Sequence, residues 1–189
     1  MTTIDISTIV FTHGSHTCTD GHCAREALHH MVCGVKQDAT PPGLSRYVSC
    51  LPALNDMAGW RDDAHRTATL APYLHRLARC LIDEARERAI SERLAGIALR
   101  VFAPEALDCA ARALRGSGIA PLADHAQKLE GYAAAMRGLP ASAAAYAAAD
   151  AADADRASAY AYAADADAAE RTERYSRLVL DAICDGYAV

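Results

Sequence analysis

The feature that most constrains the fold of this chain is a long C-terminal stretch that contains no helix breaker. No glycine or proline occurs between Pro140 and Gly186, and more than half of residues 141–169 are alanine. Alanine has the highest intrinsic helix propensity, so the stretch favours a long helix. Unbroken, that helix would span ~65 Å at 1.5 Å per residue. We therefore expect a bend or a break if it packs within a compact domain.

One face of this predicted helix carries a tyrosine or an aspartate at every seventh residue. These residues are Tyr146, Asp153, Tyr160 and Asp167. The small alanines between them would let a neighbouring helix approach closely, and a second copy of the chain could supply that helix. We predict that residues 141–189 form an alanine-rich helical extension that packs on the preceding domain and offers a surface for homo-oligomers.

Most of the preceding chain also has helical periodicity. A first helix is predicted from about His22 to Cys33, with Asp20 as its cap and Gly34 as its end. A second helix is expected to begin at Ser45 and to be short or kinked. The kink would be at Pro52.

Four more helical segments are expected before residue 140. Asp62 and Asp63 begin the first of them, and Pro72 is expected to open a new segment that runs from Tyr73 to Phe102 with Leu74, Leu77, Leu81 and Ile82 in its apolar stripe. Pro104 and Pro121 are placed to open two further helices. These should end near Gly116 and Arg137.

The N-terminus differs from the rest, because β-branched residues dominate residues 4–11. The predicted fold class is therefore mainly α, a helical bundle with a short N-terminal β-strand or hairpin. Residues 1–140 are expected to form one helical domain that carries a loop rich in histidine and cysteine, ahead of the extension at 141–189.

Composition excludes several function classes. The formal net charge of −5 argues against a nucleic-acid-binding protein, which normally needs a basic patch. The sequence holds no run of about 20 apolar residues that would cross a membrane and no secretion signal, so we expect a cytoplasmic protein. Its seven cysteines are odd in number and widely spread, which is typical of free thiols in a reducing compartment.

The segment His13–Cys23 concentrates three histidines and two cysteines ahead of the first predicted helix. Zinc takes histidine and cysteine ligands in tetrahedral sites, so His13, His16, Cys18 and His22 are candidate metal ligands. The spacing matches no standard zinc finger or ribbon. A metal at this loop, if one is bound, is expected to be zinc.

Cys23 is the candidate nucleophile of the same segment, because a thiol in the first turn of a helix feels the positive end of the helix dipole. Glu26 and His30 share its predicted face by helical spacing. The turn, cysteine and helix at Asp20–Leu28 resemble the nucleophile position of papain-like and ovarian-tumour-type cysteine hydrolases. In those families the base is a later histidine, whereas the later histidines of this chain all lie on predicted helices.

A second resemblance covers residues 4–80 and the composition of the tail. The motif Asp20-Gly21-His22-Cys23-Ala24-Arg25-Glu26-Ala27, then Asn55-Asp56, then Leu70-Ala71-Pro72 with Arg76-Leu77, is similar to a pattern in uncharacterised proteins of actinobacteria and their phages. The pattern also has a polar loop with Ser-Asp-x-Pro between the first two motifs. Of that loop this chain keeps only Asp38 and Pro41. The resemblance implies no activity. It implies that Cys23, Glu26, Asn55 and Asp56 belong to one module.

Two functions from different classes follow from these residues. In the first, the protein is a small enzyme for acyl-type transfer or hydrolysis of a small-molecule or peptide substrate. Cys23 would then be nucleophile or metal ligand, Glu26 or His30 the acid or base, and Asp56 the orienting group. In the second, the protein is a non-catalytic, phage- or prophage-related interaction protein whose His/Cys loop is structural.

Overall fold

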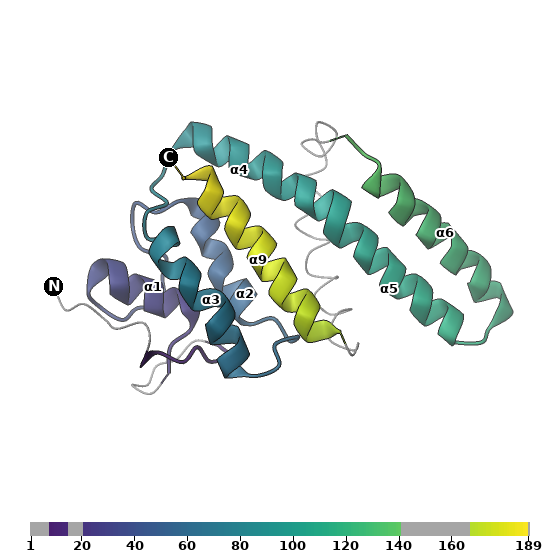
Figure 1. Cartoon of the computed structure of the whole chain (residues 1–189), viewed down its shortest axis with the longest axis horizontal. Coiled ribbons are helices and arrows are strands. Elements are labelled where there is room, and N and C mark those ends of the chain that lie inside the picture. The colour runs from purple at the N-terminus through teal and green to yellow at the C-terminus, as the bar shows by residue number, and fades with distance from the viewer. Residues whose placement is uncertain (1–7, 15–20, 141–166, 189) are drawn as a thin grey trace. The chain divides into compact units, whose positions relative to one another are not determined.

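The computed structural model describes residues 8–14, 21–140 and 167–188, which are mainly helical, as predicted (Figure 1). The elements in chain order are α1 (Ala24–Cys33), η2 (Arg46–Cys50), α2 (Leu51–Asn55), α3 (Asp63–Leu77), α4 (Glu84–Ile97), η3 (Ala98–Phe102), α5 (Ala103–Gly116), α6 (Ala120–Arg137) and α9 (Ala168–Gly186). Residues 141–166 lie outside the described part, so the predicted long helix and its tyrosines stay predictions.

The N-terminal strand is not seen in the part of the chain that the structure describes. Residues 4–7 lie outside it, and residues 8–11 make one isolated parallel bridge, between Phe11 and His22. Phe11 is held instead by α3, because its N–H donates to Thr67 Oγ1 over 2.7 Å and its carbonyl accepts from Arg66. Residues 8–11 therefore contact α3 and do not form part of a sheet.

The chain divides into two compact units. Unit 1 comprises Met1–Ile90 and Ala169–Val189, and unit 2 comprises Ser91–Ala168. Unit 1 is thus built from two segments of sequence, with all of unit 2 between them. This division lies elsewhere than the boundary at residue 140 expected from the sequence.

The core of unit 1 combines side chains from all of its longer helices. α1 contacts α2 and α3, and α9 lies beside α3 (Figure 1). The largest fully buried apolar side chains there are Phe11, Leu28, Leu51, Leu70, Leu74, Leu77, Ile90, Leu180 and Ile183. Burial of so many aliphatic side chains is the main force that holds the unit together.

Several predicted helix ends are confirmed. Gly34 ends α1 with φ of 77°, a left-handed conformation that glycine adopts without strain. Ser45 caps η2 by accepting from Tyr47 N–H, and Pro52 lies in the first turn of the short α2. Pro104 and Pro121 lie in the first turns of α5 and α6, which end at Gly116 and Arg137.

The break expected at Pro72 is wrong. α3 runs through Pro72 to Leu77, and Pro72 faces solvent. The chain breaks later because residues 80–82 pair with residues 43–45: Ser45 N–H donates to the Cys80 carbonyl over 2.7 Å and Ile82 N–H to the Gly43 carbonyl over 3.0 Å. Leu81 and Ile82 are therefore 61% exposed and do not continue the apolar stripe of a helix.

Unit 2 is organised around an antiparallel hairpin of α5 and α6 (Figure 1). The residues fully buried between the helices include Ala111, Ala126 and Ala133, so the two backbones approach closely. Two ion pairs, Arg115–Glu130 and Arg137–Asp108, join the outer edges of the hairpin. In the described residues, no helix combines the length and the apolar character needed to cross a membrane.

Candidate functional site

The start of α1 holds the candidate nucleophile of the sequence. α1 begins at Ala24, two residues later than predicted, and Cys23 rather than Asp20 is its cap. Cys23 Sγ accepts from Glu26 N–H over 3.4 Å, while Cys23 N–H donates to Glu26 Oε2 over 2.9 Å. The two residues form a reciprocal capping box, with cysteine in the place usually taken by serine or threonine.

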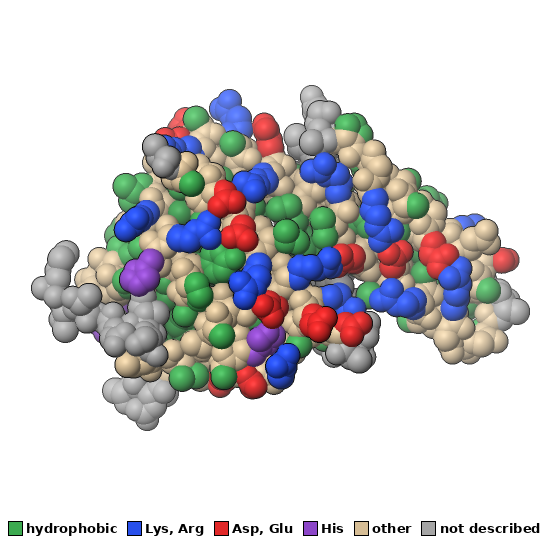
Figure 2. Space-filling model, in the orientation of Figure 1, with side chains coloured by type: hydrophobic (Ala, Val, Ile, Leu, Met, Phe, Trp, Pro, Cys, Tyr) green, Lys and Arg blue, Asp and Glu red, His purple; other side chains and the backbone are tan. Residues whose placement is uncertain are grey.

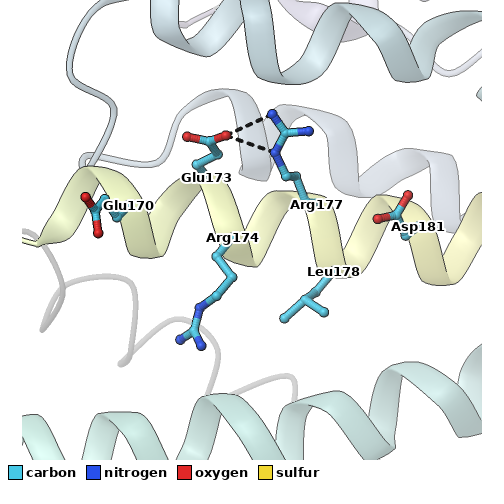
Figure 3. Close-up of a pocket in the computed structure, with 6 residues that line it drawn as sticks. All are labelled: Glu170, Glu173, Arg174, Arg177, Leu178 and Asp181. Carbon is cyan, nitrogen blue, oxygen red and sulfur yellow. Dashed lines mark hydrogen bonds and ion pairs between the residues drawn. The ribbon is translucent and has the colours of Figure 1, made fainter.

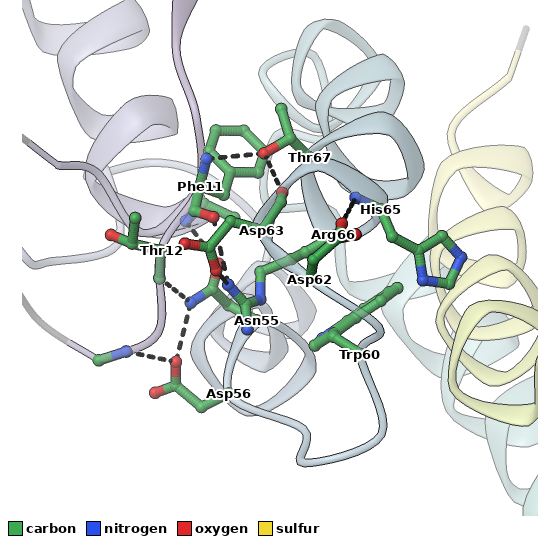
Figure 4. A network of polar contacts seen from close by, with 12 residues as sticks. Phe11, Thr12, Asn55, Asp56, Trp60, Asp62, Asp63, His65, Arg66 and Thr67 are labelled. Atoms are coloured by element: carbon green, nitrogen blue, oxygen red, sulfur yellow. Dashed lines mark hydrogen bonds and ion pairs between the residues drawn. The ribbon is translucent and has the colours of Figure 1, made fainter. Parts of the chain in front are cut away.

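Asn55 completes this cap from α2. Its Oδ1 accepts from Ala24 N–H over 3.2 Å, and its Nδ2 donates over 2.8 Å both to the Thr12 carbonyl and to Asp56 Oδ1. Asp56 Oδ1 also accepts from Gly14 N–H over 2.8 Å. Figure 4 shows Asn55 between Thr12 and Asp56. The structure thus brings Cys23, Glu26, Asn55 and Asp56 into one network.

The Cys23 thiol lies in a closed environment. The residue is 3% exposed, and its sulfur lies 3.8 Å from Asp38 Oδ1. Asp38 is itself held by Arg25, whose Nε donates to it over 2.7 Å. Burial, reinforced by the nearby Glu26 and Asp38 carboxylates, raises the pKa of the Cys23 thiol to about 11. At neutral pH the thiol is therefore protonated, and a thiol is a far poorer nucleophile than a thiolate.

The groups expected to act as acid, base or orienting residue serve other contacts. Glu26 is 1% exposed and binds the backbone of Cys23. The His30 ring stacks on His22 with centroids 6.3 Å apart, and Asp56 binds Gly14 and Asn55. These contacts organise the helix end and the loop ahead of it.

The metal prediction falls largely outside the described residues. His16 and Cys18 are not described, while His13 is exposed and His22 is half-buried. Within residues 8–14, 21–140 and 167–188, no three histidine, cysteine or acidic side chains lie close enough together to hold a metal. Zinc at His13, His16, Cys18 and His22 stays a prediction.

A second polar network joins α3 to α9. His65 Nε2 lies 2.9 Å from Glu173 Oε2, and the His65 ring packs edge-on against Trp60 (Figure 4). Trp60 is 8% exposed and donates to the Leu54 carbonyl, so it covers the core. Further along the helices, Asp181 accepts from Tyr73 and Arg76.

A hollow of about 280 Å³ runs along α9. It is lined by Glu170, Glu173, Arg174, Arg177, Leu178 and Asp181. Glu173 and Arg177 form an ion pair, and Arg174 and Leu178 point to the opposite side of the helix in the view of Figure 3. The lining has charges of both signs and no thiol, hydroxyl or imidazole, so it suits binding rather than nucleophilic chemistry.

The chain matches no family model, no curated protein and no solved structure. The site must therefore be interpreted from its own geometry.

Sequence reasoning missed a pair of thiols in unit 1. Cys80, after α3, and Cys184, on α9, are both buried, and their side chains are hydrogen-bonded to each other. The sequence gives no signal for this pairing, since the two residues lie on either side of all of unit 2.

Proposed function

We propose that this protein is a non-catalytic interaction protein, phage- or prophage-related by resemblance, that binds another protein through a helical face. The observation that carries the proposal is the reciprocal cap between Cys23 and Glu26. It uses the polar groups of both residues to cap the start of α1, so the candidate nucleophile and its nearest carboxylate have a structural role.

The network around the cap supports this interpretation. Asn55 is fully buried and joins the start of α1 to Thr12, and Asp56 fixes Gly14 at the entrance to the His/Cys loop. Buried polar side chains that satisfy backbone groups of two other segments, here residues 12–14 and the start of α1, are typical of structural contacts between segments. A catalytic centre would instead need an accessible thiolate beside a base.

The face of α9 is the binding surface that we favour. Positive and negative side chains intermingle over this helix in Figure 2. Mixed charges of this kind confer specificity and register on a protein partner more than affinity. Leu178 supplies an apolar contact among them.

The first experiment measures the reactivity of Cys23 in the native protein. Iodoacetamide at pH 7 should alkylate the exposed Cys33 rapidly and Cys23 much more slowly, and trypsin separates the two because Arg25 lies between them. Peptide mass spectrometry over time gives both rates. Alkylation of Cys23 faster than that of Cys33 would overturn the proposal and restore the cysteine enzyme.

A second measurement concerns the partner. Sedimentation velocity of the full chain over a wide concentration range reports self-association, which the alanine-rich segment is expected to mediate. A monomer at all concentrations would exclude a second copy as the partner. The helical face would then serve a different protein.

A further inference from the structure

Two thiols meet where the ends of unit 1 come together. Cys80 lies in the connection after α3 and is fully buried, and Cys184 lies in the last turns of α9 and is 5% exposed. The Cys184 thiol is hydrogen-bonded to the Cys80 sulfur. Cys80 in turn donates to the Arg76 carbonyl over 3.4 Å. The two sulfurs are therefore neighbours within one polar chain.

The surrounding contacts hold this arrangement in place. The Arg76 guanidinium binds Asp181 over 3.0 Å and Asp185 over 2.7 Å, and these two aspartates flank Cys184 on α9. On the other side, the pairing of Ser45 with Cys80 fixes the connection after α3. Both cysteines are thus fixed by contacts to their own neighbours in sequence.

The two thiols differ in acidity. The hydrogen bond from Cys184 and the nearby Arg76 guanidinium lower the pKa of Cys80, whereas the same hydrogen bond raises the pKa of Cys184. In such a pair the more acidic thiol attacks and the other resolves the intermediate. Both thiols are buried, so the reaction proceeds through a local opening that admits the oxidant.

We propose that Cys80 and Cys184 form an oxidation site that closes to an intramolecular disulfide when the protein meets a peroxide. The Cys80 sulfur attacks one peroxide oxygen, the O–O bond breaks, and the departing hydroxide takes a proton to become water. The Cys184 sulfur then attacks the resulting sulfenic acid, the S–O bond breaks, and a second water leaves with the Cys184 proton. Two thiols lose two electrons and two protons, and the peroxide is reduced to water.

The Cys80–Cys184 disulfide would join the two segments from which unit 1 is built, Met1–Ile90 and Ala169–Val189. Residues 81–183, which contain all of unit 2, would become a covalently closed loop. A long closed loop strongly restricts the unfolded chain, so the oxidised protein should unfold at a higher temperature than the reduced protein.

The arrangement of lysines makes the test direct. The chain has two lysines, Lys36 and Lys128, so a lysine-specific protease yields peptides 1–36, 37–128 and 129–189. Cys184 is the sole cysteine of the last peptide, and Cys80 shares the middle peptide with Cys50 and Cys109. A disulfide that joins these two peptides must therefore involve Cys184.

The experiment treats folded full-length protein with hydrogen peroxide at pH 7, while circular dichroism confirms that it stays folded. The remaining thiols are blocked with N-ethylmaleimide, the protein is unfolded and cleaved, and the peptides are analysed without reductant. We expect peptides 37–128 and 129–189 to be joined and to separate on reduction. The intact protein should lose the mass of two hydrogen atoms.

Matched variants identify the partner of Cys184. The link should persist in Cys50→Ser and Cys109→Ser and disappear in Cys80→Ser. Fragmentation of the joined peptides from the wild-type protein locates the sulfur independently of how any variant folds. Absence of the link in folded protein, its formation only after unfolding, or a link to Cys50 or Cys109 would each overturn the proposal.

Discussion

At the scale of single residues, the start of α1 shows how this chain satisfies backbone groups that a helix leaves without partners. The first N–H groups of any helix lack acceptors within the helix. Here Cys23 Sγ takes the N–H of Glu26 and Asn55 Oδ1 takes that of Ala24, so acceptors come from two elements. Changes at these two side chains should therefore act on stability.

Substitutions of Cys23 test the cap of α1 itself. Replacement of Cys23 by alanine removes the acceptor for Glu26 N–H and should lower the free energy of unfolding by about 1 kcal/mol. Replacement by serine, a strong cap residue, should preserve most of the stability. Urea denaturation of both variants measures the difference. Equal losses in the two variants would show that the sulfur contributes through packing rather than through the hydrogen bond.

Substitutions of Asn55 test the connection between α2, the start of α1 and Thr12. Replacement of Asn55 by alanine leaves buried groups of Ala24 and Thr12 without partners and should cost about 2–4 kcal/mol. Replacement by aspartate keeps the acceptor for Ala24 but removes the donor and adds a buried charge near Asp56, so we expect at least as large a loss. A stable Asn55→Asp variant in urea denaturation would contradict the hydrogen-bond assignment.

Part of this site could be predicted from local spacing. Glu26 follows Cys23 by three residues, which is the spacing of a capping box, and this proximity was expected from the helix. The structural role of the pair was not expected, because the pKa of the Cys23 thiol depends mainly on its burial, and burial follows from tertiary packing rather than from local spacing. The Cys80–Cys184 contact depends on how distant segments pack, which no local pattern encodes.

At the scale of elements, the attachment of α9 to α3 combines a buried apolar seam with a row of polar contacts. Leu180 and Ile183 are fully buried, and His65, Tyr73 and Arg76 of α3 bind acidic side chains of α9. The polar row fixes the register of the two helices, while burial supplies most of the stabilisation.

Glu173 gives this contact a pH dependence. Its pKa lies below the ordinary value, first because His65 hydrogen-bonds to the carboxylate and then because Arg177 does. A carboxyl whose pKa is lower in the folded state contributes stability above its unfolded pKa of about 4.3, and that stability is lost as the pH falls through the folded value.

We therefore expect Glu173→Gln to be less stable than the wild type at pH 7 and to show a flatter melting profile in acid. Melting temperatures from pH 7 to about pH 3 measure both profiles. The control is Glu170→Gln, which removes an exposed carboxylate one turn earlier on α9 and should keep the wild-type profile. Parallel acid profiles for Glu173→Gln and the wild type would contradict a role for this contact.

Gly186 fixes the end of α9 against α4. A Cβ at this position would lie 2.5 Å from Ile90 Cγ1, so Gly186→Ala should destabilise unit 1 by about 1–3 kcal/mol through overpacking. Gly131 of α6 has open space around its Cα, and Gly131→Ala should stabilise its helix by up to about 1 kcal/mol. Thermal unfolding compares the two. A loss in the Gly186→Ala/Ile90→Ala double variant that is smaller than the sum of the two single losses would confirm the contact.

α3 shows where local rules of helix termination reach their limit. Proline disfavours a helix interior, which is why a break at Pro72 was predicted. The buried side chains on both sides of it, Leu70, Tyr73, Leu74 and Leu77, gain more from continued packing than the lost hydrogen bond costs. The helical class and most helix ends were predictable, whereas the pairing of residues 80–82 with 43–45 depends on tertiary contacts.

At the scale of the whole molecule, the two units differ in the size of the side chains that they bury. Unit 1 buries large aliphatic side chains, whereas the fully buried positions of the α5–α6 hairpin include Ala111, Ala126 and Ala133. Alanine buries little apolar area, so the hairpin gains less free energy per residue from burial. Surface ion pairs such as Arg115–Glu130 add little.

Hydrogen exchange should reveal this difference. We expect backbone amides of α5 and α6 to exchange faster than those of α3 and α9, because opening a hairpin with a small core costs less. Exchange followed by mass spectrometry resolves the four helices. Equal protection in the two units would show that they unfold as one cooperative body.

The division of unit 1 into two segments also sets an order of events during synthesis. Residues 169–189 leave the ribosome only after the whole of unit 2 has been made, yet they supply Leu180 and Ile183 to the core that begins with Phe11. Until then, the apolar side chains of residues 1–90 that pack against α9 stay exposed to solvent. We expect nascent chains that stop short of α9 to bind chaperones, and unit 1 to fold only once translation has passed it.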